Sequence, residues 1–237
     1  MKRVSLIAGA LALLGGYQAL AADLPPPAAP PPRAPAAYLP PPLFTWTGIY
    51  IGINGGYGFG STSWTQPAPC GLAACATGNF NAGGFLVGGQ LGGNYQIGQF
   101  VIGLEGDGDW TNINGTTTVL GCGAGCTTSN DWLATVRGRA GYAWDRILFY
   151  GTGGAAFGNI QANVGAAGVT TLSTQTGWTA GVGIEGAFAP NWTARVEYLY
   201  VDLGSASCAA AICGGTGTTT IPLTENIVRA GVNYKFW

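Results

Sequence analysis

Apolar and polar residues alternate along the last stretch of the chain, from Glu225 to Trp237. From Val228 onward every second residue is apolar, and the residues between are charged, amide-bearing or glycine. A period of two is that of a β-strand, whose successive side chains point to opposite faces. We therefore expect a strand that lies between lipid and a polar interior. The stretch alone leaves open the alternative of a soluble β-sandwich strand.

Similar alternation recurs along the chain beyond Phe44, where no segment has a convincing helical period of 3.6 residues. The composition there shifts to glycine, threonine, aromatic and β-branched residues, which favours an all-β fold. The segment 147–158 does not reveal which of its residues share a face. The eight strands that we predict span residues 46–59, 80–96, 100–110, 130–143, 147–158, 175–188, 192–202 and 226–237.

The connections between these strands alternate in length. Short turns are expected at 96–99, 143–146 and 189–191. The other connections are long and polar, at 60–79, 111–129, 159–174 and 203–225. This rhythm predicts an eight-stranded antiparallel up-and-down transmembrane β-barrel, with short periplasmic turns, long external loops and both chain ends on the periplasmic side.

A membrane barrel and a lipocalin-like soluble barrel show the same alternation of apolar and polar residues. They differ in which face points inward, because the apolar face of the soluble barrel lines its interior. Eight strands enclose little more than packed side chains. The apolar face carries most of the Trp, Tyr and Phe with many Ile, Leu and Val, which is more bulk than such an interior holds. We therefore expect large apolar residues to face lipid and small or charged residues to face inward.

Aromatic residues gather near the predicted strand ends, where girdles at both headgroup levels are expected in a membrane barrel. Besides the C-terminal group they are Trp46, Phe59, Tyr95, Phe100, Trp110, Trp132, Tyr142, Trp144, Phe188 and Trp192.

Acidic and basic residues fall on neighbouring strands of the polar face. Charges taken out of water need partners, so we predict an internal ion-pair network that narrows or plugs the lumen. Its predicted members are Glu105, Asp107, Arg137, Arg139, Glu185, Arg195, Glu197, Arg229 and Lys235. The alternative is that these charges line a hydrated channel.

The start of the chain has the features of an exported protein. Lys2 and Arg3 precede a short apolar run, and Ala19-Leu20-Ala21 offers a cleavage site, which predicts a signal peptide over 1–21. Ten of the fourteen prolines lie within 23–42. Because proline disfavours helix and sheet, we expect a proline-rich periplasmic linker over 22–45, followed by the barrel over 46–237.

The charge balance argues against nucleic acid as a partner. The chain has 9 basic and 10 acidic residues and only 8% charged residues. No basic stripe is present that would bind phosphates.

The six cysteines lie in the predicted external loops, as three pairs close in sequence. In an exported chain this spacing predicts local disulfides. Zinc is a weaker alternative, because the chain has no histidine and no C-x-x-C spacing. The predicted pairs are Cys70 with Cys75, Cys122 with Cys126, and Cys208 with Cys213.

The absence of histidine also argues against an enzyme, because triad hydrolysis and His-bound metal catalysis need an imidazole. Glu105 and Asp107 could in principle act as paired acids. Arginines are expected opposite them, so we predict a structural role, with no cofactor and no metal.

Several motifs together resemble one family. They are the exported, proline-rich start, W-T-G-I-Y-I-G at Trp46 to Gly52, R-G-R-A-G-Y at Arg137 to Tyr142, R-V-E-Y at Arg195 to Tyr198, and the final G-V-N-Y-K-F. The chain is similar over roughly 46–237 to the small outer-membrane β-barrels of alphaproteobacteria, the porin-family or outer-membrane immunogenic proteins related to the OmpA membrane domain.

The resemblance implies an abundant surface barrel in the outer membrane, in contact with its lipid and lipopolysaccharide. The aromatic end, Tyr234, Phe236 and Trp237, resembles the signal that hands such barrels to their assembly machinery. Peptidoglycan and a host surface are further possible partners.

Three functional hypotheses follow. The first is a non-enzymatic surface barrel with a structural, envelope-integrity or host-interaction role and a largely closed lumen. The second is a porin for passive diffusion of small hydrophilic solutes. The third is an adhesin or receptor that binds through its loops.

Overall fold

The computed structural model describes residues 44–65, 78–118, 125–164, 169–208 and 219–236 of the 237-residue chain. The predicted signal peptide and most of the predicted linker therefore lie outside the described residues. Eight long strands form: β1 (Gly48–Thr62), β2 (Phe80–Ile97), β3 (Phe100–Thr117), β4 (Cys126–Trp144), β5 (Ile147–Val164), β6 (Val169–Ala187), β7 (Trp192–Cys208) and β8 (Thr219–Lys235).

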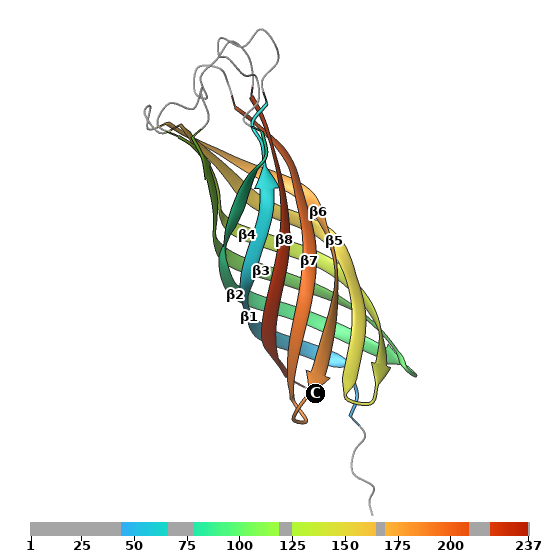
Figure 1. Cartoon of the computed structure of the whole chain (residues 1–237). Coiled ribbons are helices and arrows are strands. Elements are labelled where there is room, and N and C mark those ends of the chain that lie inside the picture. The colour runs from blue at the N-terminus through green and yellow to red at the C-terminus, as the bar shows by residue number, and fades with distance from the viewer. Residues whose placement is uncertain (1–43, 66–77, 119–124, 165–168, 209–218, 237) are drawn as a thin grey trace, which may run out of the picture. The chain divides into compact units, whose positions relative to one another are not determined.

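Each strand pairs with its sequence neighbours, and β1 pairs antiparallel with β8, so the sheet closes into a barrel (Figure 1). The predicted eight-stranded antiparallel barrel is confirmed. None of the described residues forms a helix long and apolar enough to span a membrane.

The outward faces are apolar, as the alternation predicts. On β1, Ile49, Ile51, Ile53, Tyr57 and Phe59 all point away from the barrel and are exposed. Soluble proteins rarely expose contiguous apolar patches of this kind. A belt of such side chains around a closed barrel is the surface expected to face lipid.

Aromatic residues pair across strands at two levels of this outer surface. Phe100 with Tyr142 and Trp192 with Tyr234 pair near the short turns, at 5.8 and 5.2 Å between ring centroids. Tyr57 with Phe85 and Trp178 with Tyr200 pair further along their strands, at 5.2 and 5.4 Å.

The short connections lie together at one end of the barrel, at the same end as the C-terminus (Figure 1). In the β2–β3 turn Gly98 has a φ of 63°, which glycine adopts without strain. In the β4–β5 turn Asp145 has a φ of 53°, a left-handed conformation in which aspartate is enriched among residues other than glycine. This end is the periplasmic end in barrels of this kind.

Several strands are longer than predicted and continue into segments that the sequence assigned to loops. For example, β3 ends at Thr117 rather than near 110, and β8 begins at Thr219 rather than near 226. A membrane crossing requires about 9–11 residues, whereas the strands have 15–19. The prediction relied on apolar alternation, which ends where a strand leaves the hydrocarbon although its backbone pairing continues.

The lumen contains more apolar side chains than expected. In the part distant from the short turns, the interior is a buried apolar cluster formed by Leu86, Leu133, Ala156, Ile160, Leu199, Val201, Leu203, Ala206, Leu223 and Ile227. The expectation that only small and charged residues face inward is therefore wrong for this half. Among the described residues, the arginine–carboxylate pairs lie nearer the short turns, and packed apolar side chains occupy this half.

The short-turn end of the lumen is closed by residues that precede β1. Trp46 is 2% exposed, and its indole nitrogen donates to the Asp145 carbonyl at 3.3 Å. Its backbone nitrogen donates to the Gln96 side chain at 2.8 Å. Trp46 packs with Val101, Ala143, Leu148 and Tyr150. The assignment of Trp46 to an aromatic girdle is therefore wrong, because the ring turns inward and covers the mouth.

Glycines on the inner face make room for two buried tyrosines. Gly92 lies directly opposite Tyr50 across β1 and β2, and Gly183 lies directly opposite Tyr150 across β5 and β6. A methyl group on either glycine would overlap the facing tyrosine. The tyrosine rings therefore lie across the neighbouring strand, where aromatic side chains cover glycines in many sheets.

We predict that Gly92→Ala lowers the free energy of unfolding by about 1–3 kcal/mol, because overpacking displaces the Tyr50 ring. Urea unfolding of the barrel in lipid vesicles measures this. The control is Gly108→Ala, where nothing lies within 4 Å of the added methyl. Equal effects of the two substitutions would contradict the proposed packing.

Candidate functional site in the barrel lumen

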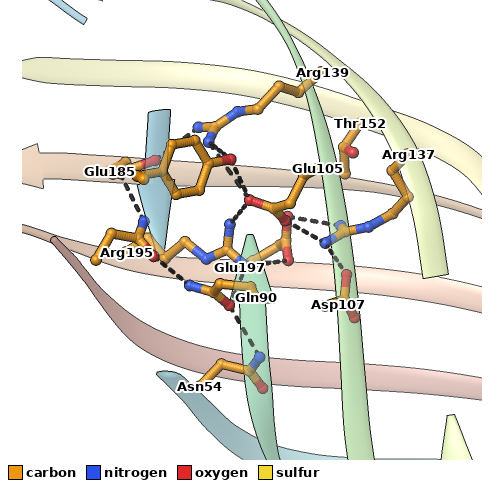
Figure 2. Close-up of polar contacts among 12 residues, drawn as sticks. Asn54, Gln90, Glu105, Asp107, Arg137, Arg139, Thr152, Glu185, Arg195 and Glu197 are labelled. Carbon is orange, nitrogen blue, oxygen red and sulfur yellow. Dashed lines mark hydrogen bonds and ion pairs between the residues drawn. The ribbon is translucent and has the colours of Figure 1, made fainter. Parts of the chain in front are cut away.

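A network of charged side chains lies in the lumen between the apolar cluster and the covered mouth. Figure 2 shows its polar contacts. Its carboxylates come from β3, β6 and β7, and its arginines from β4, β7 and β8. Tyr50 on β1, Gln90 on β2 and Tyr150 on β5 complete it. Every strand of the barrel therefore contributes a side chain.

Arg137 joins three strands. Its guanidinium contacts Glu105 at 2.6 Å, Asp107 at 2.8 Å and Glu197 at 3.0 Å. Its Nε donates to the Thr135 hydroxyl at 2.8 Å. Because each guanidinium nitrogen has an acceptor, the desolvated charge is well compensated.

Glu105 accepts hydrogen bonds from two residues besides Arg137 and forms a longer ion pair with a third. The Tyr50 hydroxyl donates to it at 2.5 Å, Arg195 binds it directly, and Arg139 lies at 3.7 Å. Figure 2 shows Glu105 between Arg137 and Arg139.

Arg139 also reaches Glu185 at 2.7 Å and lies 4.0 Å from the centre of the Tyr150 ring. This is within the range of a cation–π contact.

Arg229 connects β8 to the far side of the network. It contacts Asp107 at 2.9 Å, Asp109 at 3.0 Å and Glu197 at 2.8 Å. The described ion pairs thus join four arginines, at 137, 139, 195 and 229, to five carboxylates, at 105, 107, 109, 185 and 197. Their formal charge is +4 and −5, so the network carries a net charge of −1.

Water has almost no access to these groups. The side chains in the ion pairs are between 0% and 3% exposed. Leu199, Leu203 and Leu223 in the adjoining apolar cluster are 0–1% exposed. A water-lined channel would leave such groups accessible, whereas both layers are packed as in a protein interior.

The structure brings together most of the charged residues that the sequence proposed for the network. Lys235 is the exception. It lies at the mouth, where its ammonium group donates to the Thr45 carbonyl and lies 4.4 Å from the centre of the Phe44 ring. It is the last residue of β8, six residues beyond Arg229. This position places it away from the carboxylates.

Sequence reasoning missed several members. Asp109 is two residues from Asp107 and therefore lies on the same face of the strand. This alternation could have identified it as a member of the network. Tyr50 could have been found from its position between the outward Ile49 and Ile51. The sequence did not indicate Tyr150, because its segment does not show which residues share a face. It did not indicate Gln90 either, because an uncharged amide on the inner face is not specific to an ion-pair network.

A carboxylate that the sequence did not single out stands apart from the network. Glu225 is 0% exposed, and neither of its carboxyl oxygens has a hydrogen-bond partner among the described residues. It points inward between Leu223 and Ile227 on β8, both members of the apolar cluster. An unpartnered buried polar group is destabilising.

The predicted disulfides and assembly signal are only partly described. Cys126 is disulfide-bonded. Cys70, Cys75, Cys122 and Cys213 lie outside the described residues, as does the side chain of Cys208, so the pairing stays a prediction. Tyr234 and Phe236 point outward at the end of β8, with ring centroids 5.4 Å apart. Trp237 is not described.

The network offers little to acid–base chemistry, because arginines occupy its carboxylates. No group of three or more potential metal-ligating residues occurs in the described parts of the chain. The arrangement can brace the barrel and block its lumen.

Comparison with known families agrees with this architecture. The model of the outer membrane protein beta-barrel domain matches residues 37–236. The chain belongs to this outer-membrane β-barrel family. Its location is the outer membrane.

Relatives of this outer-membrane barrel occur in alphaproteobacteria. The 31 kDa outer-membrane immunogenic protein of Brucella melitensis is 35% identical, over 98% of this chain and 99% of the relative. The 22 kDa outer membrane protein of Rhizobium leguminosarum is 31% identical, over 82% and 80%. The crystal structure of OprG from Pseudomonas aeruginosa aligns with 80% of this chain and 97% of its own, with 13% identity and a TM-score of 0.48.

We predict that Arg137→Met lowers the free energy of unfolding by about 3–5 kcal/mol, because it leaves buried carboxylates without their partner. Urea unfolding in vesicles measures the loss. Arg146→Met, in the exposed β4–β5 turn, is the control and is expected to change stability by less than about 0.5 kcal/mol. A similar loss in both variants would show that the network does not stabilise the barrel.

We predict the opposite effect for Glu225→Leu. The leucine matches the surrounding apolar cluster and removes an unpartnered carboxyl, so the free energy of unfolding should rise by about 1–3 kcal/mol. Glu185→Leu, which removes a partner of Arg139, should instead destabilise the barrel in the same assay. A destabilising Glu225→Leu would indicate a partner for this carboxyl.

Proposed function

We propose that the protein is a non-enzymatic surface barrel with a closed lumen, which contributes to the integrity of the outer membrane and displays external loops. The observation that carries this proposal is the near-complete burial of both lumen layers. A barrel filled in this way resists deformation, since its ion pairs join strands on opposite walls.

The lengths of the strands support the display of loops. With 18 residues and about 3.3 Å per residue, β2 and β3 are roughly 60 Å long. At the tilt of about 35–45° usual in such barrels they rise roughly 40–50 Å, whereas the apolar band is about 25 Å tall. The strands therefore project well beyond the hydrocarbon and would hold their connecting loops above it. The Brucella relatives are named immunogenic proteins, which fits a host-facing surface in this chain as well.

The proposal of a non-enzymatic role is supported by the chain's chemistry. It contains no histidine, and arginines bind Glu105, Asp107 and Glu197. The outward Tyr234 and Phe236 would be available to the assembly machinery before the barrel closes.

A diffusion porin is the competing function, and conductance in planar bilayers distinguishes the two. We expect no steady open-channel current from the wild-type barrel. A variant with Arg137→Ala, Arg139→Ala, Leu203→Ala and Leu223→Ala removes bulk from both layers and should conduct.

Val136→Ala and Val228→Ala, on the lipid-facing surface, form the matched control and should remain silent. The change in gel mobility on boiling verifies that each variant is folded. A steady wild-type current comparable to that of the opened variant would contradict the closed lumen.

A further inference from the structure

The outer surface of the barrel is hollowed where β8, β1 and β2 lie side by side. The cavity has a volume of about 490 Å³, within the range of about 300–1,000 Å³ typical of small-molecule sites. The residues that matter for its chemistry are Tyr57, Phe59, Ser61, Asn81, Thr224 and Asn226.

The strand register arranges the outward residues of this region in three rows. From the short-turn side upward, the rows are Val228–Tyr57–Phe85, then Asn226–Phe59–Gly83, then Thr224–Ser61–Asn81. The surface thus changes from wholly apolar to wholly polar within four residues of each strand. The Tyr57 ring extends toward the second row, because its hydroxyl lies over Gly83.

The change from apolar to polar places the hollow at the edge of the hydrocarbon. The outward apolar run of β1 extends from Ile49 to Phe59, which matches the roughly 9–11 residues of a membrane crossing. Polar groups without partners are excluded from hydrocarbon. Ser61 and its row therefore lie at the level of the lipid headgroups.

The polar groups of the hollow are available to a ligand. Ser61, Asn81 and Thr224 make no side-chain hydrogen bond within the described part of the chain. Asn226 accepts from the Tyr198 hydroxyl at 2.6 Å through its carbonyl oxygen, which leaves its amide hydrogens free to donate. Donors and acceptors therefore border the exposed face of Phe59.

The absence of charged side chains in the lining distinguishes between anionic and neutral lipid headgroups as ligands. The lining contains no acidic or basic residue. The described arginines and Lys235 lie in the lumen or at its mouth, apart from Arg146 in a turn at the opposite end. Phosphate binding relies on arginine, lysine or clustered backbone N–H groups. A neutral ligand with hydroxyl groups and an apolar face suits this site better, and a pyranose has both.

We propose that this hollow binds a neutral sugar in the headgroup of an outer-leaflet glycolipid. The C–H face of the sugar packs on Phe59, and its hydroxyl groups bond to the amides of Asn81 and Asn226 and the hydroxyls of Ser61 and Thr224. The hollow opens sideways at the hydrocarbon edge, where the sugar of a lipid lies beside the barrel. The site is independent of the lumen, so failure of either proposal leaves the other intact.

The test uses the full-length barrel in phosphatidylcholine vesicles with increasing fractions of glucosyl diacylglycerol, or of phosphatidylglycerol with the same acyl chains. A ligand that binds only the folded state raises its stability. We expect the urea midpoint of the wild type to rise further with the glycolipid than with phosphatidylglycerol. Phe59→Leu, Asn81→Leu and Thr224→Val should each require about five- to tenfold more glycolipid for the same rise.

Thr176→Val is the matched control for Thr224→Val, because Thr176 is an exposed threonine on β6, away from the hollow. It should behave as the wild type. Native mass spectrometry of retained glycolipid gives a second measurement that does not depend on the stability of a variant, and the three hollow variants should retain less.

Two results would overturn the proposal. One is an equal midpoint rise with both lipids, or a glycolipid effect that survives all three substitutions. The other is an equal rise on adding soluble methyl glucoside to the barrel in detergent at matched concentration, which would make the hollow a site for free sugars.

Discussion

Backbone hydrogen bonding is the constraint on which the rest of this structure depends. Within hydrocarbon no water is available to pair N–H and C=O groups, so a sheet that crosses it must have no free edge. The pairing of β1 with β8 meets this requirement. Closure with only eight strands produces a narrow lumen, and every inward side chain must then pack against side chains from the opposite wall.

The narrow lumen explains both layers of the interior. Arg137 and Arg229 are desolvated and are tolerated because carboxylates from other strands reach them. Where the inward residues are leucine, isoleucine and valine, packing replaces ion pairing. Inward glycines such as Gly92 and Gly183 are as important as the large residues, because they leave space for the tyrosines that lie across the neighbouring strand. Among the described inward carboxyls, Glu225 is the one whose two oxygens both lack a hydrogen-bond partner.

The outer surface has a different organisation, which the membrane determines. Its apolar belt ends abruptly above Phe59, and the strands continue as polar ribbons beyond it. The proposed function rests on this filled cylinder and on its long strands, which would hold the connecting loops above the membrane. The same geometry places hydroxyl and amide groups beside aromatic rings at the level of lipid headgroups, where recognition of lipid becomes possible without any opening of the lumen.

The sequence by itself determined the strand count, the closed antiparallel architecture and the outward face, because alternation with a period of two depends only on local chain geometry. It also indicated that charges such as Glu105 and Arg137 would pair, since these lie opposite each other on adjacent strands. Only the tertiary structure decided that Arg229 reaches Asp109, that Lys235 lies outside the network, that Trp46 covers the mouth and that leucines fill half of the lumen. Those outcomes depend on the stagger of the strands, which brings residues far apart in sequence to the same height inside the barrel, and no local pattern records that stagger.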